Sequence, residues 1–198
     1  LNWLPAIELF GEGLFIRLRE DRTAEWEDTY GDEYGAMQSR LERSNVGCEN
    51  FSPRYVLLHT LAHLLIRQFS LECGYSGAAI KERIYSTYPD SNVSMAGILL
   101  YTSSSDSDGS LGGLVRKGLP DSLEMIFRNM LQEASWCSSD PICINSKAQG
   151  YDSLNYAACH ACALLPETSC EMRNCLLDRA AVTGTLSNRA RGYFGSLL

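Results

Sequence analysis

The strongest constraint on the fold is a concentration of cysteines near the end of the chain. Six of the eight cysteines fall between residues 137 and 175. Cysteine thiolates are preferred ligands of tetrahedral zinc, and a closed all-cysteine site is structural rather than catalytic. Cys159 and Cys162 form a Cys-x-x-Cys pair, which brings two sulfurs to one ion through local backbone alone. The segment therefore predicts a structural zinc site.

A second pair of ligands has to come from elsewhere in the segment. Cys137 and Cys143 flank Asp140-Pro141, a turn-forming dipeptide that lets this spacing fold back on itself. A fifth candidate follows the Cys-x-x-Cys pair and can replace either member of the second pair. The candidate zinc ligands are Cys137, Cys143, Cys159, Cys162 and Cys170.

The two other notable side chains of this segment are not expected to bind the ion. Cys175 falls in a run, residues 171–181, that resembles a packed helix, so we interpret it as a core residue. His160 lies inside the Cys-x-x-Cys turn, where its ring should point away from the metal.

Three other states of the cysteines compete with zinc binding. Eight cysteines in 198 residues lie below the density of a disulfide scaffold, and no secretory segment is visible. A thioredoxin-like redox pair lacks its helix-and-strand context here, and unliganded buried thiols are the remaining alternative. Clustered thiols of this kind predict a reducing, cytoplasmic location.

The composition is that of a globular protein, with 45% hydrophobic and 21% charged residues. The sequence contains no run of eighteen apolar residues, so no membrane span is predicted. The net charge of −7 disfavours autonomous binding of nucleic acid, which usually needs a basic surface. A local patch could still contact DNA. Its candidate residues are Arg54, Arg67, Lys81, Arg83, Arg116 and Lys117.

The clearest predicted element is a helix from Pro53 to Ser70, with Ser52 as its N-cap and Gly74 as its stop. This helix is apolar on nearly every side, so we expect it to be buried at the centre. Strands are predicted at residues 14–18, 78–88 and 95–102, and further helices at 36–44 and 119–136.

These elements predict an α+β (mixed α/β) fold in which a small sheet surrounds a buried central helix. A cysteine-rich zinc-binding subdomain completes it at the C-terminal end. The predicted organisation is an α/β core at residues 1–136, a cysteine-rich segment at 137–181 packed on the same domain, and a tail at 182–198.

His59 and His63 are four residues apart and therefore share one face of the central helix. A zinc peptidase needs a glutamate beside the first histidine, and this chain has Thr60 there. We interpret the pair as hydrogen-bonded core histidines, with a metal-binding or catalytic role as the less favoured interpretation. The alternative is a cryptic hydrolase or nuclease-like site that combines them with Asp106 or Asp108.

The two aspartates lie in a serine- and glycine-rich loop, residues 103–113, between a predicted strand and a helix. Such a loop can hold a phosphate on its backbone amides or simply cap a helix. It matches neither the Walker pattern nor the dinucleotide fingerprint. The chain therefore has no ATPase motif.

Five stretches in order carry a family resemblance: LPAIELFGEGLFIRL, YVLLHTLAHLLI, GILLYTSSSDSDGSLGGL, CSSDPIC and NYAACHACALLPETSCE. Together they resemble the helicase-associated zinc-binding domain called MZB, in the version found at the end of the DrmB family of bacterial anti-phage DISARM systems. The resemblance runs from about Leu4 to Ala181.

The resemblance implies structural Zn²⁺ on the cysteine block, with Cys170 matching as well as the other four candidates. The first two cysteines are usually closer together in such domains, which leaves the fourth ligand open. It also implies a non-catalytic module that docks on a superfamily-2 DNA helicase (DrmA-like) and assists in engaging DNA.

Overall fold

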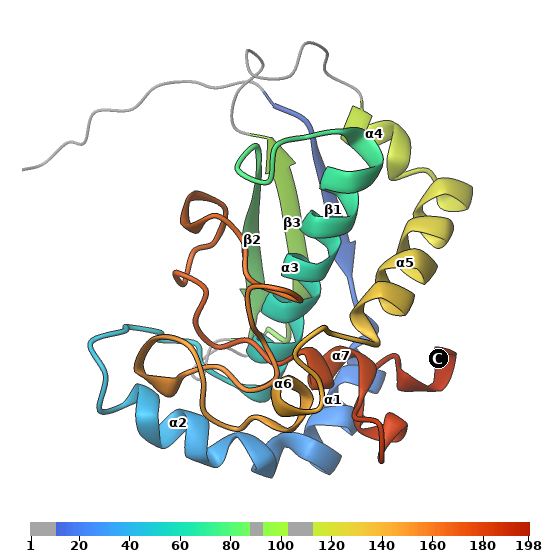
Figure 1. Ribbon diagram of the computed structural model, residues 1–198. Coiled ribbons are helices and arrows are strands. Elements are labelled where there is room, and N and C mark those ends of the chain that lie inside the picture. The colour runs from blue at the N-terminus through green and yellow to red at the C-terminus, as the bar shows by residue number, and fades with distance from the viewer. Residues whose placement is uncertain (1–10, 88–92, 103–112) are drawn as a thin grey trace, which may run out of the picture.

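The computed structural model describes residues 11–87, 93–102 and 113–198 of the chain (Figure 1). It has a mixed α+β fold with one antiparallel sheet of three strands: β1 (Gly13–Arg17), β2 (Ile80–Ser86) and β3 (Ala96–Thr102). The strand order is β1-β3-β2. The predicted fold class is confirmed, and the most apolar strand, β3, is central.

The central helix α3 (Pro53–Cys73) begins and ends where its capping residues predict. The side chain of Ser52 accepts a hydrogen bond from the amide of Tyr55 at 3.1 Å, which satisfies one free donor of the first turn. Gly74 ends the helix with φ of 73°, a left-handed conformation that favours glycine.

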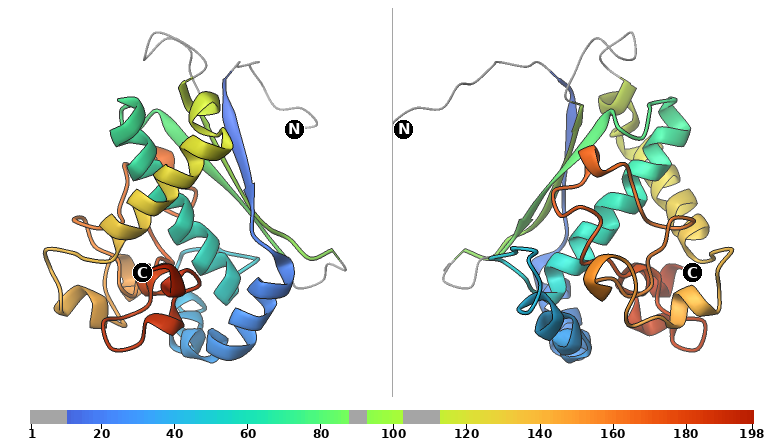
Figure 2. Two further views of the ribbon diagram at one scale, coloured as in Figure 1. Left: turned by 90° about the vertical axis from the view of Figure 1, so that its right-hand side faces the viewer. Right: turned by 60° about the vertical axis from the view of Figure 1, so that its left-hand side comes forward.

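Helix α3 lies against one face of the sheet and also contacts helices α5 (Pro120–Ala134) and α7 (Arg179–Thr183) (Figure 2). Along β2, the side chains of Ile80, Glu82 and Ile84 alternate onto the buried face. The opposite face is more open, and Phe15 of β1 is 60% exposed there. Buried neighbours of α3 therefore come from the sheet on one side and from the C-terminal half on the other.

The remaining elements are short. They are α1 (Glu20–Tyr30), η1 (Gly31–Tyr34), α2 (Gly35–Leu41), α4 (Gly113–Lys117), α6 (Ile142–Asn145), η2 (Tyr151–Ser153), η3 (Glu167–Ser169), η4 (Arg189–Arg191) and η5 (Gly195–Leu197). Helix α1 was not predicted, because its sequence is polar and only Thr23 and Trp26 are buried. Within the described residues, no helix has the length and apolar character of a membrane span.

The expected helical run at residues 171–181 is wrong. Only Arg179 onward is helical, because Arg173, Asn174 and Leu176 have φ values of 52°, 60° and 63°. Right-handed helix cannot pass through left-handed residues. The side chain of Asn174 holds this turn by accepting from the amide of Leu165 and donating to its carbonyl, both at 2.8 Å. Cys175 is nevertheless fully buried in the apolar core, as predicted.

Candidate metal centre

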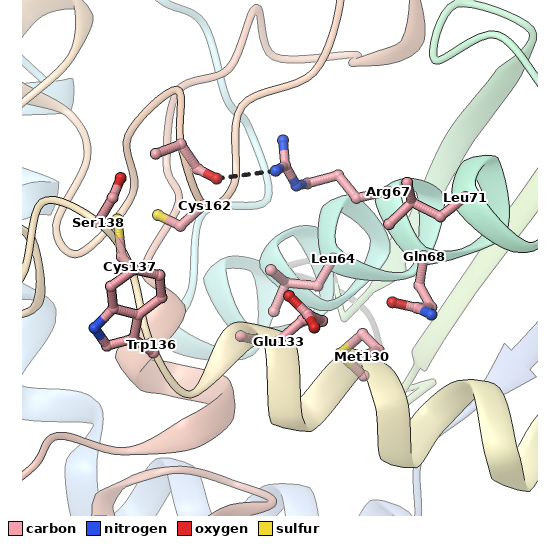
Figure 3. Close-up of a pocket in the computed structure, with 12 residues that line it drawn as sticks. Leu64, Arg67, Gln68, Leu71, Met130, Glu133, Trp136, Cys137, Ser138 and Cys162 are labelled. Carbon is pink, nitrogen blue, oxygen red and sulfur yellow. Dashed lines mark hydrogen bonds between the residues drawn. The ribbon is translucent and has the colours of Figure 1, made fainter.

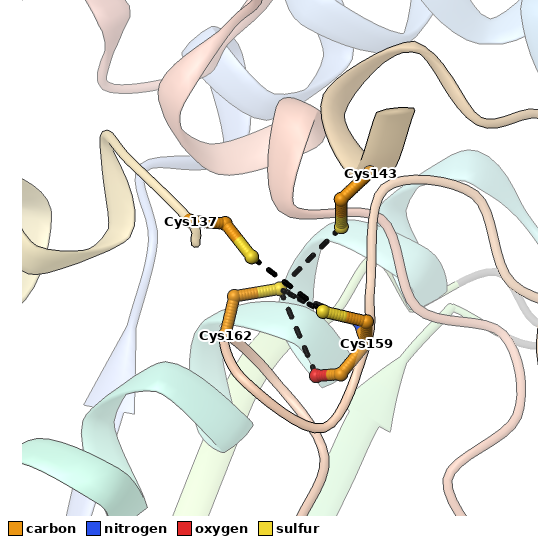
Figure 4. A group of neighbouring side chains, drawn as sticks. All are labelled: Cys137, Cys143, Cys159 and Cys162. Carbon is orange, nitrogen blue, oxygen red and sulfur yellow. Dashed lines mark hydrogen bonds between the residues drawn. The ribbon is translucent and has the colours of Figure 1, made fainter. Parts of the chain in front are cut away.

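Four cysteines of the segment 137–162 meet at one point (Figure 4). The sulfur atoms of Cys137 and Cys159 are 3.5 Å apart, those of Cys143 and Cys162 are 3.8 Å apart, and those of Cys159 and Cys162 are 3.7 Å apart. All four lie within 4.8 Å of one another. We call this group the four-cysteine cluster.

The spacing of the sulfurs fits a tetrahedral ion. With a zinc–sulfur bond of about 2.3 Å, the edge of a regular tetrahedron of sulfurs measures about 3.8 Å. A disulfide would need sulfurs only about 2.05 Å apart, and all eight cysteines are free. The observed distances therefore match the edges of a metal tetrahedron and not cystines.

Three local structures present the four thiols. Cys137 follows the end of helix α5, Cys143 lies in α6, and Cys159 and Cys162 stand on either side of a tight turn. Backbone amides point at two of the sulfurs: Ser139 donates to Cys137 at 3.4 Å, and Cys159 donates to Cys162 at 3.3 Å. Amide donors of this kind stabilise a thiolate over a thiol.

Asp140 holds the first half of the cluster in shape. Its carboxylate accepts hydrogen bonds from the amides of Cys137 at 2.9 Å and Ile144 at 3.0 Å. The same carboxylate pairs with the buried guanidinium of Arg179 at 2.7 Å, and Arg179 also donates to the carbonyl of Ala134 at 2.9 Å. Together these contacts connect the end of α5, the turn at Asp140 and the start of α7.

Cys170 does not join the four-cysteine cluster. Its sulfur lies 3.2 Å from Nε2 of His59, in a second group that also contains His63 and Glu82. Oε1 of Glu82 is 2.9 Å from Nε2 of His59 and 3.5 Å from Nε2 of His63. We call this group the His–Glu–Cys quartet. The prediction of His59 and His63 as hydrogen-bonded core residues agrees with their complete burial.

Charges inside the quartet shift the pKa values of its members. Burial raises the pKa of Glu82, but the charges and hydrogen bonds of His59 and His63 outweigh it and hold that pKa well below its usual range. Burial likewise raises the pKa of the Cys170 thiol, and the histidines overcome this and lower it to about 6. Burial alone would depress the pKa of His59, but Glu82 and Cys170 raise it.

Glu82 is the member of the quartet that the sequence analysis missed, although its signal was present. Ile80, Glu82 and Ile84 alternate along β2, so that a glutamate occupies a position otherwise used for buried apolar side chains. A charged residue on the inward face of a strand needs a partner.

Other predicted residues are placed as follows. His160 is exposed and points to no sulfur of the cluster, as expected. Asp106 and Asp108 lie outside the described residues, as does most of the serine-rich loop.

Four of the six basic residues named for DNA contact have partners within the fold: Arg54, Arg67, Arg83 and Lys117. Arg54 is also buried, so it cannot contribute to a surface patch.

A groove with a volume of about 160 Å³ opens beside the four-cysteine cluster, between helices α3 and α5 (Figure 3). Cys137 and Cys162 contribute to its wall. Leu71 and Trp136 lie at opposite ends of the groove, and their exposed fractions are 76% and 67%. The guanidinium of Arg67 donates to the carbonyl of Ala161 at 2.9 Å across one side.

Two comparisons relate the chain to known proteins. Residues 61–163 match the family MZB, described as the MrfA Zn-binding domain. The whole chain aligns at 43% identity with the DISARM protein DrmB of Bacillus paralicheniformis. The chain spans 36% of the length of that relative.

Proposed function

This chain belongs to the MZB family of zinc-binding domains, and we propose that it is a non-catalytic, zinc-stabilised module of a DISARM-type defence assembly. The convergence of four sulfurs at tetrahedral spacing carries the proposal. The identity to a DISARM protein over the full chain supports the biological setting. We assign Cys137, Cys143, Cys159 and Cys162 as the ligands. Zinc bound there would cross-link the end of α5 to the turns that follow.

The four-cysteine cluster favours a structural role over a catalytic one. Four sulfur ligands complete a tetrahedral shell and leave no position for water or substrate. A cryptic hydrolase that uses His59 and His63 has little support, because both side chains are completely buried in the protein interior. Catalytic groups have to reach a substrate, which these cannot.

We further propose that the groove between α3 and α5 is where the module docks on a superfamily-2 DNA helicase of the DrmA type. Exposed large apolar side chains gathered around a groove are typical of protein contacts. Trp136 is an amphipathic aromatic of the kind that dominates binding energy at such interfaces. The net charge of −7 also suits a protein partner better than DNA. Direct contact with DNA would contribute little to the binding.

Binding of the purified protein to the helicase subunit of the same system tests this docking site. The double variant Leu71→Ala with Trp136→Ala should bind about tenfold or more weakly, since an interface hot spot such as a tryptophan contributes about 2 kcal/mol or more. Leu186→Ala is the matched control, because Leu186 is also exposed, at 63%, but does not line the groove. Equal affinity of the double variant and the control, or no binding by the unaltered protein, would overturn the docking proposal.

A further inference from the structure

The His–Glu–Cys quartet has the composition of a metal site in its own right. It contains two imidazoles, one carboxylate and one thiol, all ligand types of zinc. One ligand atom from each of His59, His63, Glu82 and Cys170 falls within a group no wider than 4.8 Å. The residues come from helix α3, strand β2 and the turn after η3, so only the tertiary fold brings them together.

The distances fit a tetrahedral ion. Zinc–nitrogen and zinc–oxygen bonds of about 2.1 Å and a zinc–sulfur bond of about 2.3 Å imply edges of about 3.4 Å from nitrogen to oxygen and about 3.6 Å from nitrogen to sulfur. The two nitrogen–oxygen edges measure 2.9 and 3.5 Å, and the edge from His59 to Cys170 measures 3.2 Å. The edge from His63 to Glu82 already has the tetrahedral length, and an entering ion would have to lengthen the other two by about half an ångström or less.

The hydrogen bonds around His63 prepare this ring to be a ligand. Its Nδ1 is 2.8 Å from the carbonyl oxygen of Ala163, so Nδ1 carries the proton and donates. With the proton on Nδ1, Nε2 can present its lone pair to a metal ion; this atom is buried, makes no hydrogen bond and lies 3.5 Å from Oε1 of Glu82. A carbonyl that fixes the tautomer in this way is the usual support of a metal-bound histidine.

Cys170 has the same surroundings as a cysteine of the four-cysteine cluster. Its sulfur accepts from the amides of Met172 at 3.3 Å and Asn174 at 3.2 Å. Cys137 likewise accepts from the amide two residues further along, that of Ser139, at 3.4 Å. Amides aimed at a buried sulfur stabilise the thiolate, which is the form that binds metal.

Charge balance points the same way. An isolated charge in a protein interior is costly unless it is neutralised. One carboxylate and one thiolate carry two negative charges, and a divalent cation between them and two neutral imidazoles makes the site neutral overall. All four side chains are buried, so that balance has to come from within the quartet, either from a divalent cation or, without metal, from protonated histidines.

We propose that His59, His63, Glu82 and Cys170 form a second zinc site, structural and separate from the four-cysteine cluster. Its metal would connect α3 and β2 to the loop that begins at Cys170. The set is closed, with four protein ligands and no open position, which distinguishes it from a catalytic site. The carbonyl held by His63 belongs to Ala163, the residue directly after Cys162, so the two sites are adjacent along the chain.

Metal analysis of the purified protein tests the proposal. Unaltered protein should contain about two zinc ions per chain after removal of loosely bound metal, whereas Glu82→Gln and Cys170→Ala should each contain about one. Cys175→Ala is the matched control, since Cys175 is a buried thiol five residues from Cys170 that belongs to neither group. It should keep both ions.

X-ray absorption of the zinc in unaltered protein gives a second readout that needs no variant to fold. If both sites are occupied, the two zinc shells together contain five sulfurs and three nitrogen or oxygen atoms, so the averaged signal is mixed. A shell of sulfur alone, together with one zinc per chain, would overturn the proposal and identify the quartet as a metal-free ion pair.

Discussion

Helix α3 is buried and the loops that carry the four cysteines are partly exposed, and different interactions hold the two regions in place. Helix α3 is one long regular element whose apolar side chains pack on the sheet and on α5. The longest helix between Cys137 and Asp178, α6, has four residues, and much of this segment runs as turns. Its backbone geometry depends on polar contacts, such as those of Asp140 and Asn174.

The difference shows how a chain can order a region that lacks periodic structure. When an amphipathic or apolar helix packs against its neighbours, the burial of its apolar side chains offsets the conformational entropy lost when the helix forms. Irregular turns have few repeating backbone hydrogen bonds, so a cross-link at a few points has to replace them. A zinc site contributes folding free energy directly in such segments. The two regions should therefore respond differently to loss of metal and to loss of apolar volume.

The largest expected effect is loss of the four-cysteine site. Cys159→Ser should remove its zinc and unfold the C-terminal third, because a structural zinc contributes about 10 kcal/mol or more of folding free energy. Metal content and hydrogen exchange of residues 137–178 measure the result. Cys73→Ser is the control, since Cys73 is half-buried and outside both ligand groups. Unchanged melting without metal loss in Cys159→Ser would contradict this prediction.

A smaller effect is expected from a cavity in the helical region. Leu61 is completely buried on α3, so Leu61→Ala should lower the free energy of unfolding by about 2–5 kcal/mol. Urea denaturation gives this value, and zinc content should stay that of the unaltered protein. Leu71→Ala on the same helix should be close to neutral, because its side chain is 76% exposed. Loss of zinc in Leu61→Ala would show that the two regions are not separable.

The smallest effect concerns a carboxylate of η1 that ties the cysteine-rich segment to the C-terminal residues. Glu33 pairs with Lys147 of the cysteine-rich segment at 2.9 Å and with Arg191 at 2.8 Å. Partial burial raises the pKa of Glu33, but hydrogen bonds and charges from Arg191 and Lys147 outweigh it and lower that pKa overall. A lowered pKa stabilises the fold above the pKa of the unfolded glutamate, and this contribution fades as the pH falls through the folded value.

Glu33→Gln should therefore cost less than about 1 kcal/mol at neutral pH, because Glu33 is 38% exposed and solvent screens the pairs. The difference from unaltered protein should vanish in acid, below the lowered pKa. Paired urea titrations at pH 7 and at acid pH measure it. A difference that grows in acid would contradict the assignment.

Much of the architecture could be read from local signals. Ser52, Pro53 and Gly74 delimit α3, and the apolar run at 95–102 identifies the central strand. The Cys-x-x-Cys pair and the turn at Asp140-Pro141 predict the four-cysteine cluster, because the local backbone at each place brings two cysteines together. The failures were α1, whose polar sequence hides two buried side chains, and residues 171–181, where left-handed residues interrupt the helix.

The sequence by itself determined the central helix, the three strands and the gathering of thiols at the C-terminal end. These features follow from interactions between residues close along the chain. Only the tertiary structure decided that Cys170 contacts His59, a residue 111 positions away, and not the four-cysteine cluster. It also placed Glu82 between the two histidines. Such contacts depend on how α3 packs on the sheet, and no local pattern encodes the distance between surfaces that meet only after folding.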